Sequence, residues 1–262
     1  MVERSQGLAR TFESSVGGNR ADELEVVVQN PRRPVLNRRD RGANQRKFFR
    51  DKVIDDLLLA VAFRRLRQEV VADENRDSGV DAIFGVCLAE KSLDPLAIFR
   101  RLTALPFCNL HGPEHHIIVA ASLLTAYRNS GVRLDLRSAL VEARNRGGRV
   151  PGGVCGFWGA CGAGVSVGIF VSIATGSTPL AGREFGLANL ATSKALGEIG
   201  AVGGPRCCKR DSYLAILAAV EFARENLGVA MQIADSLPVV CAHSTRNNQC
   251  LGARCPFFPQ NR

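Results

Sequence analysis

The chain has 262 residues, of which 46% are hydrophobic and 23% charged, and its formal net charge is +9. This apolar content supports a hydrophobic core, and a mean hydropathy near zero is typical of a soluble protein. The basic charge favours a nucleic-acid partner, but the chain has only two Tyr and one Trp for stacking on bases and no recognition motif. We therefore expect no nucleic-acid partner.

Residues 1–45 are predicted to form a flexible basic tail. Residues 1–50 hold eleven Lys and Arg against six Asp and Glu, a net of +5, and the tail is rich in Arg, Asn, Gly and Ser. The start, MVERSQGLAR, lacks the apolar segment of a secretory signal, so we expect a reducing, cytoplasmic compartment. Residues 46–262 are predicted to form one Cys- and His-rich domain.

Apolar periodicity predicts a mainly α-helical fold for this domain. The expected helices span residues 48–71, 93–105, 113–131, 134–146, 158–175, 185–199 and 209–227, with an apolar segment at 82–90. One strand is predicted at 229–240, and a Cys-rich segment follows it. Cys87 and Cys108 stand alone in apolar surroundings and are expected to be buried structural thiols.

The stretch 152–180 carries no charge and is expected to organise the fold. Its predicted helix, 158–175, begins with Trp158 and has a stripe of small residues: Cys161, Gly164, Gly168, Ser172 and Thr175. Gly176 is expected to end it, and Thr178 to cap the next helix. The stretch is long enough to cross a bilayer, but its glycines favour a central helix buried on all sides of a soluble domain and no membrane span.

Three of the four histidines lie in the motif HGPEHH, as His111, His115 and His116. They fall at the predicted start of a helix, where the helix dipole favours neutral imidazole. A neutral imidazole can accept a proton or bind a metal ion. Catalysis by His115 or His116, with His111 binding substrate, and simple capping of the helix remain alternative interpretations.

Adjacent Cys207 and Cys208 begin the helix predicted from residue 209. Thiols at a helix N-terminus, next to Lys209 and Arg210, are expected to ionise to thiolates, which bind metals and act as nucleophiles. Cys207 is therefore a candidate metal ligand and Cys208 a candidate catalytic residue. Lys209 and Arg210 are candidates for binding an anionic group of the substrate.

The last three cysteines, Cys241, Cys250 and Cys255, have eight and four residues between them, and the last is followed by Pro256. This irregular spacing lacks the paired Cys-x-x-Cys knuckles of zinc fingers and favours an iron–sulfur cluster over structural zinc. These three cysteines leave a fourth position on the cluster. We expect either that it stays open for substrate or that one of four other cysteines fills it: Cys155, Cys161, Cys207 or Cys208.

Four ordered motifs, HGPEHH, GGVCGFWGACGAG, GGPRCCKRDS and CAHSTRNNQCLGARCPFF, together resemble an uncharacterised prokaryotic Cys/His-rich family of unknown function. The resemblance covers roughly residues 82–258 and implies no activity. A looser likeness links the chain to iron–sulfur serine dehydratases and cysteine desulfidases. That likeness implies a [4Fe–4S] cluster held by three thiolates, with substrate at the open iron.

Three functions therefore stand as hypotheses. The first is an iron–sulfur enzyme that performs Lewis-acid elimination or sulfur transfer on a small anionic substrate. The second is a zinc-binding structural or interaction module, and the third is a metal-free thiol redox or sulfur-transfer protein.

Overall fold

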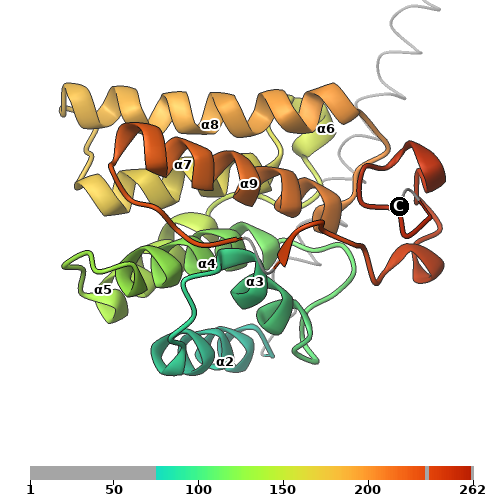
Figure 1. Cartoon of the computed structure of the whole chain (residues 1–262), viewed down its shortest axis with the longest axis horizontal. Helices are drawn as coiled ribbons and strands as arrows, with labels where there is room; N and C mark the ends of the chain where they lie inside the picture. The colour runs from blue at the N-terminus through green and yellow to red at the C-terminus, as the bar shows by residue number, and fades with distance from the viewer. Residues whose placement is uncertain (1–74, 234–235, 261–262) are drawn as a thin grey trace, which may run out of the picture. The chain divides into compact units, whose positions relative to one another are not determined.

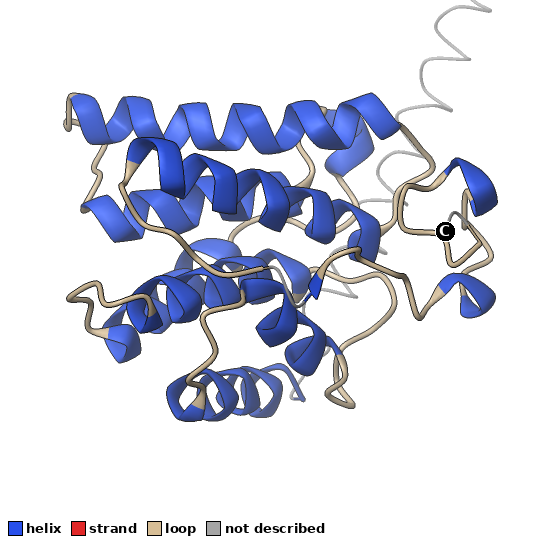
Figure 2. Cartoon of the chain, viewed as in Figure 1, coloured by secondary structure: helices blue, strands red, loops and turns tan. Residues whose placement is uncertain are grey.

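The computed structural model describes residues 75–233 and 236–260 (Figure 1). This part of the chain consists of helices and loops and contains no strand (Figure 2). Within it the eight α-helices are α2 (Asn75–Ala89), α3 (Pro95–Thr103), α4 (His115–Asn129), α5 (Leu136–Gly147), α6 (Cys155–Trp158), α7 (Gly162–Thr175), α8 (Arg183–Val202) and α9 (Cys208–Asn226). Two short 3-10 helices, η2 (Ser244–Arg246) and η3 (Gly252–Arg254), follow in the C-terminal segment. The predicted mainly helical fold is confirmed.

Helix α7 is the central helix, and it packs against α4, α5, α8 and α9. Phe170 on one side is fully buried, while the small residues allow α8 to approach closely. A Cβ added at Gly168 would lie 1.9 Å from Thr192 Oγ1, and one added at Gly164 would lie 2.6 Å from a methyl carbon of Leu196. The predicted stripe of small residues is thus the surface on which α8 packs.

The central helix is shorter than predicted. Gly159 adopts the left-handed conformation, with φ of +65°, and ends the four-residue helix α6. Helix α7 then begins at Gly162, so Trp158 lies outside it and is 61% exposed. Gly176 ends α7 in the left-handed conformation, as predicted. Thr178 was expected to cap the next helix, but it closes a turn with Ala181, and α8 begins only at Arg183.

A serine of α7 joins this helix to α4, the most buried helix of the fold. The Ser166 hydroxyl donates to the His116 carbonyl at 2.6 Å and accepts from the Ala120 amide at 2.9 Å. The hydroxyl therefore bridges a carbonyl and an amide four residues apart, two groups that normally hydrogen-bond directly to each other in an α-helix. This arrangement fixes the first turn of α4, which carries the histidines.

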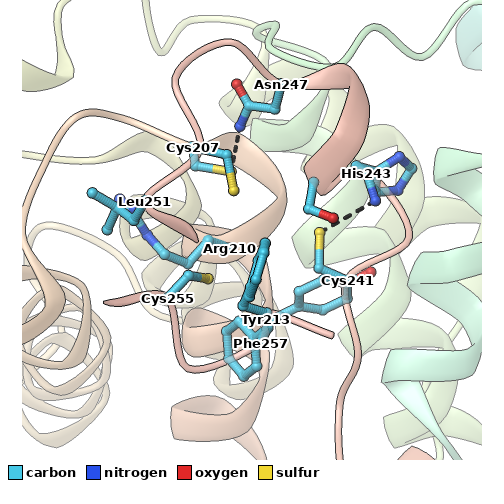
Figure 3. A pocket seen from close by; sticks show the side chains of 12 residues that line it. Cys207, Arg210, Tyr213, Cys241, His243, Asn247, Leu251, Cys255 and Phe257 are labelled. Atoms are coloured by element: carbon cyan, nitrogen blue, oxygen red, sulfur yellow. Dashed lines mark hydrogen bonds between the residues drawn. The ribbon is translucent and has the colours of Figure 1, made fainter. Parts of the chain in front are cut away.

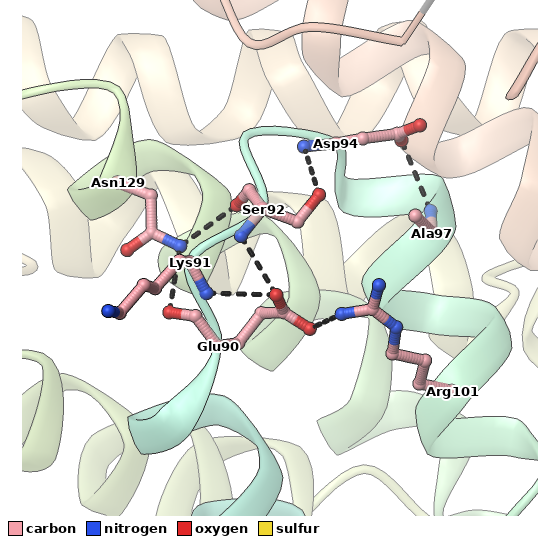
Figure 4. A network of polar contacts seen from close by, with 7 residues as sticks. All are labelled: Glu90, Lys91, Ser92, Asp94, Ala97, Arg101 and Asn129. Atoms are coloured by element: carbon pink, nitrogen blue, oxygen red, sulfur yellow. Dashed lines mark hydrogen bonds and ion pairs between the residues drawn. The ribbon is translucent and has the colours of Figure 1, made fainter. Parts of the chain in front are cut away.

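The loop between α2 and α3 is held by its own polar groups (Figure 4). The Glu90 carboxylate accepts from the amides of Lys91 and Ser92, both at 2.8 Å, and pairs with Arg101. The Asn129 side chain at the end of α4 donates to the Glu90 and Ser92 carbonyls at 3.1 and 2.8 Å. These contacts satisfy the loop backbone and attach it to the core helix.

The segment after α9 crosses α3 on its way to the last cysteines. The Gln232 amide donates to the Leu93 carbonyl at 3.1 Å, and the Ser236 hydroxyl donates to the Asp94 carboxylate. Arg100 of α3 donates to the Ser236 carbonyl at 3.1 Å. The prediction of a strand at 229–240 is wrong for the described residues of that range, because their backbone contacts are with a helix and a loop rather than with a second strand.

The predicted tail, 1–45, and the predicted helix at 48–71 lie outside the described residues. In the part of the chain that the structure describes, no helix has the length and apolar character needed to cross a bilayer.

Candidate metal centre

Four cysteines line one small cavity between the start of α9 and the C-terminal segment (Figure 3). Cys207 is the N-cap residue of α9, and Cys241, Cys250 and Cys255 come from the segment opposite. Side chains of six further residues complete much of the wall: Arg210, Tyr213, His243, Asn247, Leu251 and Phe257. The three last cysteines of the chain and Cys207 thus face a common space, as the sequence predicted.

Short turns shape the C-terminal segment around this cavity. The Cys241 amide donates to the Phe257 carbonyl at 2.8 Å and so joins the two ends of the segment. The Asn247 side chain accepts from the Gln249 amide at 2.9 Å, an Asx turn that reverses the chain before Cys250. Gly252, with φ of +59°, makes a second reversal before Cys255.

Each of the four sulfur atoms receives an N–H group. The amides of His243 and Gly252 donate to the sulfurs of Cys241 and Cys250 at 3.3 and 3.4 Å. The Phe257 amide donates in the same way to Cys255. The remaining sulfur, that of Cys207, accepts from the Asn247 side chain at 3.6 Å, and backbone amides of the first turn of α9 also point at it. A neutral thiol is a weak acceptor, so this set of donors suits thiolates.

Burial opposes the thiolate form of three cavity cysteines. It raises the pKa of Cys207, Cys241 and Cys255, and outside the cavity it raises the pKa of Cys208 to about 11. The expectation that the helix N-terminus makes Cys207 and Cys208 thiolates is therefore wrong: desolvation outweighs the neighbouring amides and charges.

The spacing of the cavity sulfurs is wider than a single zinc ion requires. Among the described residues, no three of these four sulfurs lie within 4.8 Å of one another. A zinc ion bound at about 2.3 Å by each sulfur would hold them roughly 3.8 Å apart, whereas an iron–sulfur cubane separates its ligand sulfurs by roughly 7 Å.

The two predicted cationic substrate ligands are already engaged. Arg210 lines the cavity, but its guanidinium pairs with Asp211 at 2.9 Å and donates to the Gly203 and Pro205 carbonyls. Lys209 is 1% exposed and points away, toward His115. Except for the pair with the adjacent Asp211, the sequence does not indicate these contacts, because they depend on the distant His115 or on the turn before α9.

Lys209 lies at the centre of a buried polar group. Its ammonium is 3.0 Å from His115 Nε2, 3.3 Å from Cys108 Sγ and 3.2 Å from the Asn109 carbonyl. Cys108, Glu114 and His115 also bring three potential ligand atoms within 4.8 Å of one another. The Lys209 ammonium contacts Cys108 Sγ and His115 Nε2, so it occupies the space that a metal ion would need in this group. Cys108 was expected to be a lone structural thiol; it is instead the lysine's partner.

The histidines of HGPEHH lie outside the cavity lining. His115 Nδ1 contacts the Gly112 carbonyl at 3.0 Å, and His116 Nδ1 contacts the Val150 carbonyl at 3.0 Å. Burial lowers the pKa of His115 to about 3 and also lowers that of His116, so both are neutral at pH 7. The expected neutral form thus follows mainly from burial rather than from the helix dipole.

His111 connects the cavity to a second group of cysteines. Its Nε2 is 3.1 Å from Asn247 Oδ1, and its Nδ1 accepts from the Cys208 amide at 3.4 Å. Cys155 and Cys161 do not line the cavity; Cys161 instead lies near Asp211, Cys155 and Cys208. Of the four candidates for the fourth ligand, only Cys207 therefore lines the cavity. Sequence reasoning also missed Asn247, although an Asn between spaced cysteines is a recognisable turn signal.

The model of a family of unknown function, DUF5714, matches residues 83–258 of the chain. The chain belongs to this family, in agreement with the resemblance carried by its four motifs. Comparisons with curated proteins and with solved structures find no match. They lend no support to the looser likeness to serine dehydratases and cysteine desulfidases.

Proposed function

We propose that this member of the DUF5714 family is an iron–sulfur protein that holds a [4Fe–4S] cluster through Cys207, Cys241, Cys250 and Cys255. The observation that carries the proposal is that each of the four sulfurs lining one cavity receives an N–H donor. Such donors stabilise thiolates and are one of the levers that set cluster potentials. The spread of the sulfurs favours a cluster over a single zinc ion.

Four thiolates support electron transfer better than Lewis-acid chemistry. A cluster that binds substrate needs an iron without a protein ligand, and four cysteines leave none. The residues expected to bind an anionic substrate, Lys209 and Arg210, are held by other partners. The elimination or sulfur transfer on a small anion that the sequence suggested would therefore require that Cys207 does not bind the cluster, so that one iron is open to substrate.

The surroundings of the cavity suit a redox role. Tyr213 and Phe257 lie at its floor with ring centroids 5.4 Å apart, and Arg210 favours the Cys255 thiolate electrostatically. A nearby cation and N–H···S bonds stabilise the more negative, reduced cluster and raise its reduction potential. Aromatic rings exclude water, which disfavours the more negative state and lowers the potential.

A direct test is anaerobic purification of the full chain, followed by iron, zinc and acid-labile sulfide analysis and an absorption spectrum. The C250S/C255S variant should lose about four irons and four sulfides per chain relative to the wild type. The matched control is Cys87→Ser, since Cys87 is buried outside the cavity. Stoichiometric zinc in the wild type, or an unchanged iron content in the double variant, would refute the proposal.

A further inference from the structure

A thiol and an amine meet in the first turn of α9, outside the cavity. Lys209 Nζ lies 3.3 Å from Cys108 Sγ, although the two residues are 101 positions apart in the chain. Lys209 is 1% exposed, whereas Cys108 is only half-buried. A small oxidant can therefore reach the sulfur, while the amine beside it stays shielded from water.

Three acceptors surround the Lys209 ammonium and match its three N–H groups. Besides Cys108 Sγ, they are the Asn109 carbonyl at 3.2 Å and His115 Nε2 at 3.0 Å. His115 Nδ1 lies 3.0 Å from the Gly112 carbonyl, which assigns the ring proton to Nδ1 and leaves Nε2 as the acceptor. The ammonium is therefore held with one N–H directed at the sulfur.

Of these three acceptors, only Cys108 can carry a negative charge. A carbonyl is neutral, and burial lowers the pKa of His115 to about 3, so its ring is neutral as well. Burial raises the pKa of Cys108, the Lys209 ammonium opposes this rise, and the Glu114 carboxylate adds to it. The thiol is thus the main form at pH 7, and the thiolate that attacks an oxidant forms directly beside an ammonium.

We propose that peroxide couples Cys108 to Lys209 through a sulfur–nitrogen bond, a sulfenamide. The Cys108 thiolate first attacks one oxygen of hydrogen peroxide and the O–O bond breaks, so the sulfur is oxidised to a sulfenic acid and the peroxide is reduced. The leaving hydroxide takes a proton from the Lys209 ammonium and departs as water. The neutral amine then attacks the sulfur, the S–O bond breaks, and the hydroxyl leaves with one amine proton as a second water.

The arrangement favours the amine as the group that traps the sulfenic acid. Sulfenic acids condense with a neighbouring thiol or nitrogen, and here a nitrogen is already in contact with the sulfur. Because the ammonium loses its proton in the first step, the amine becomes nucleophilic only after the sulfur has been oxidised. The bond ties the first turn of α9 to the loop after α3 and prevents further oxidation of Cys108 to a sulfinic acid.

Peptide mapping of the full chain after treatment with hydrogen peroxide tests this bond. Free thiols are labelled with N-ethylmaleimide before digestion with trypsin. The bond should join peptide 102–128, which contains Cys108, to peptide 207–210, at a mass about 2 Da below the sum of the two peptides and their thiol labels. The cut after Lys209 should be absent, because trypsin does not recognise the modified lysine. A thiol reductant should separate the peptides.

Three results would overturn the proposal. A disulfide from Cys108 to Cys207 or Cys208 also removes about 2 Da, but it leaves the cut after Lys209 in place, so a linked product that contains peptide 207–209 contradicts the sulfenamide. A mass about 14 Da above the sum would place an oxygen between the two atoms and exclude the direct bond. Recovery of Cys108 only as an unlinked sulfinic acid would show that the lysine does not trap it.

A lysine variant tests the protection of Cys108. Lys209→Gln should accumulate sulfinic acid at Cys108, a gain of about 32 Da, in a larger fraction of chains than the wild type. The matched control is Lys194→Gln, since Lys194 pairs with Glu221 on the surface. Equal sulfinic fractions in all three proteins would refute the trapping role. The wild-type peptide map decides the bond if Lys209→Gln does not fold, and it does so whether or not the chain holds iron.

Discussion

The packing of α7 on α8 makes a quantitative prediction for Gly168→Ala. An added Cβ would lie 1.9 Å from Thr192 Oγ1 and 3.2 Å from the Ala188 carbonyl. The Thr192 hydroxyl donates to that carbonyl at 3.0 Å, so it can move away only by giving up this hydrogen bond. That loss costs about 0.5–1.5 kcal/mol, and the shift of α8 costs about 1–3 kcal/mol.

The gain in helix propensity offsets part of this cost. Alanine is favoured over glycine in a helix interior by about 1 kcal/mol, so Gly168→Ala should lower the free energy of unfolding by about 0.5–3.5 kcal/mol. Gly197→Ala is the matched control: it is also inside a helix, but nothing lies within 4 Å of its added Cβ. We expect that variant to raise the free energy of unfolding by about 0.5–1 kcal/mol.

Urea denaturation of the two variants, at equal metal content, measures this difference. Combining Gly168→Ala with Thr192→Ala should recover part of the loss, because the nearest clashing atom is then absent. If Gly168→Ala stabilised the protein as much as Gly197→Ala, the close approach of α7 and α8 would be refuted. An unchanged urea slope is required for either comparison.

Three further perturbations test other parts of the structure. Asp94→Ala removes the cap of α3 and the acceptor of Ser236, so it should cost about 2–3 kcal/mol in urea melts, whereas Asp135→Ala, at an exposed cap, should cost less. Burial raises the pKa of Cys87 from 9.0 to about 11, so the unfolded thiol ionises first and stability falls as pH rises from 9 to 11. Cys87→Ala should remove up to about 2–3 kcal/mol of this alkaline loss, seen as a flatter plot of stability against pH. Deletion of residues 1–45 should leave a cooperative thermal melt, and loss of that melt would show that the deleted segment belongs to the core.

Most of the helical fold could be predicted from the sequence, because local signals mark its helices. Asp94 and Asp135 cap α3 and α5, and Gly176 ends α7. The errors fall where local signals conflict. Apolar character continues through Gly159, but the left-handed backbone there separates α6 from α7. The many apolar residues at 229–240 favoured a strand, although the described part of that segment makes its hydrogen bonds to α3 and to the loop before it.

The convergence of the last three cysteines could also be predicted, but the separation of the remaining cysteines from them could not. Cys207 and Cys208 are neighbours in sequence, but Cys207 is the N-cap residue, with an extended backbone, and only Cys208 belongs to the helix. Cys207 therefore faces the C-terminal segment, while Cys208 lies near Cys161. Sequence spacing carries no information about such directions across distant segments. The role of Lys209 could not be foreseen either, because its partners lie about a hundred positions away.

The motif CCKRD, residues 207–211, forms the N-cap and first turn of α9, and its residues have different surroundings. Cys207 and Arg210 line the cavity, Cys208 lies near Cys161, and Lys209 points toward His115. The turn buries Lys209, Arg210 and Asp211, each less than 5% exposed. Buried charges contribute little to stability, and apolar residues of similar size often serve as well. These buried charges instead fix the conformation of the turn. Arg210 donates to the Gly203 and Pro205 carbonyls, and Asp211 accepts from the Cys207 amide at 3.3 Å. The turn therefore holds the two neighbouring thiols in different surroundings, Cys207 at the cavity and Cys208 near Cys161.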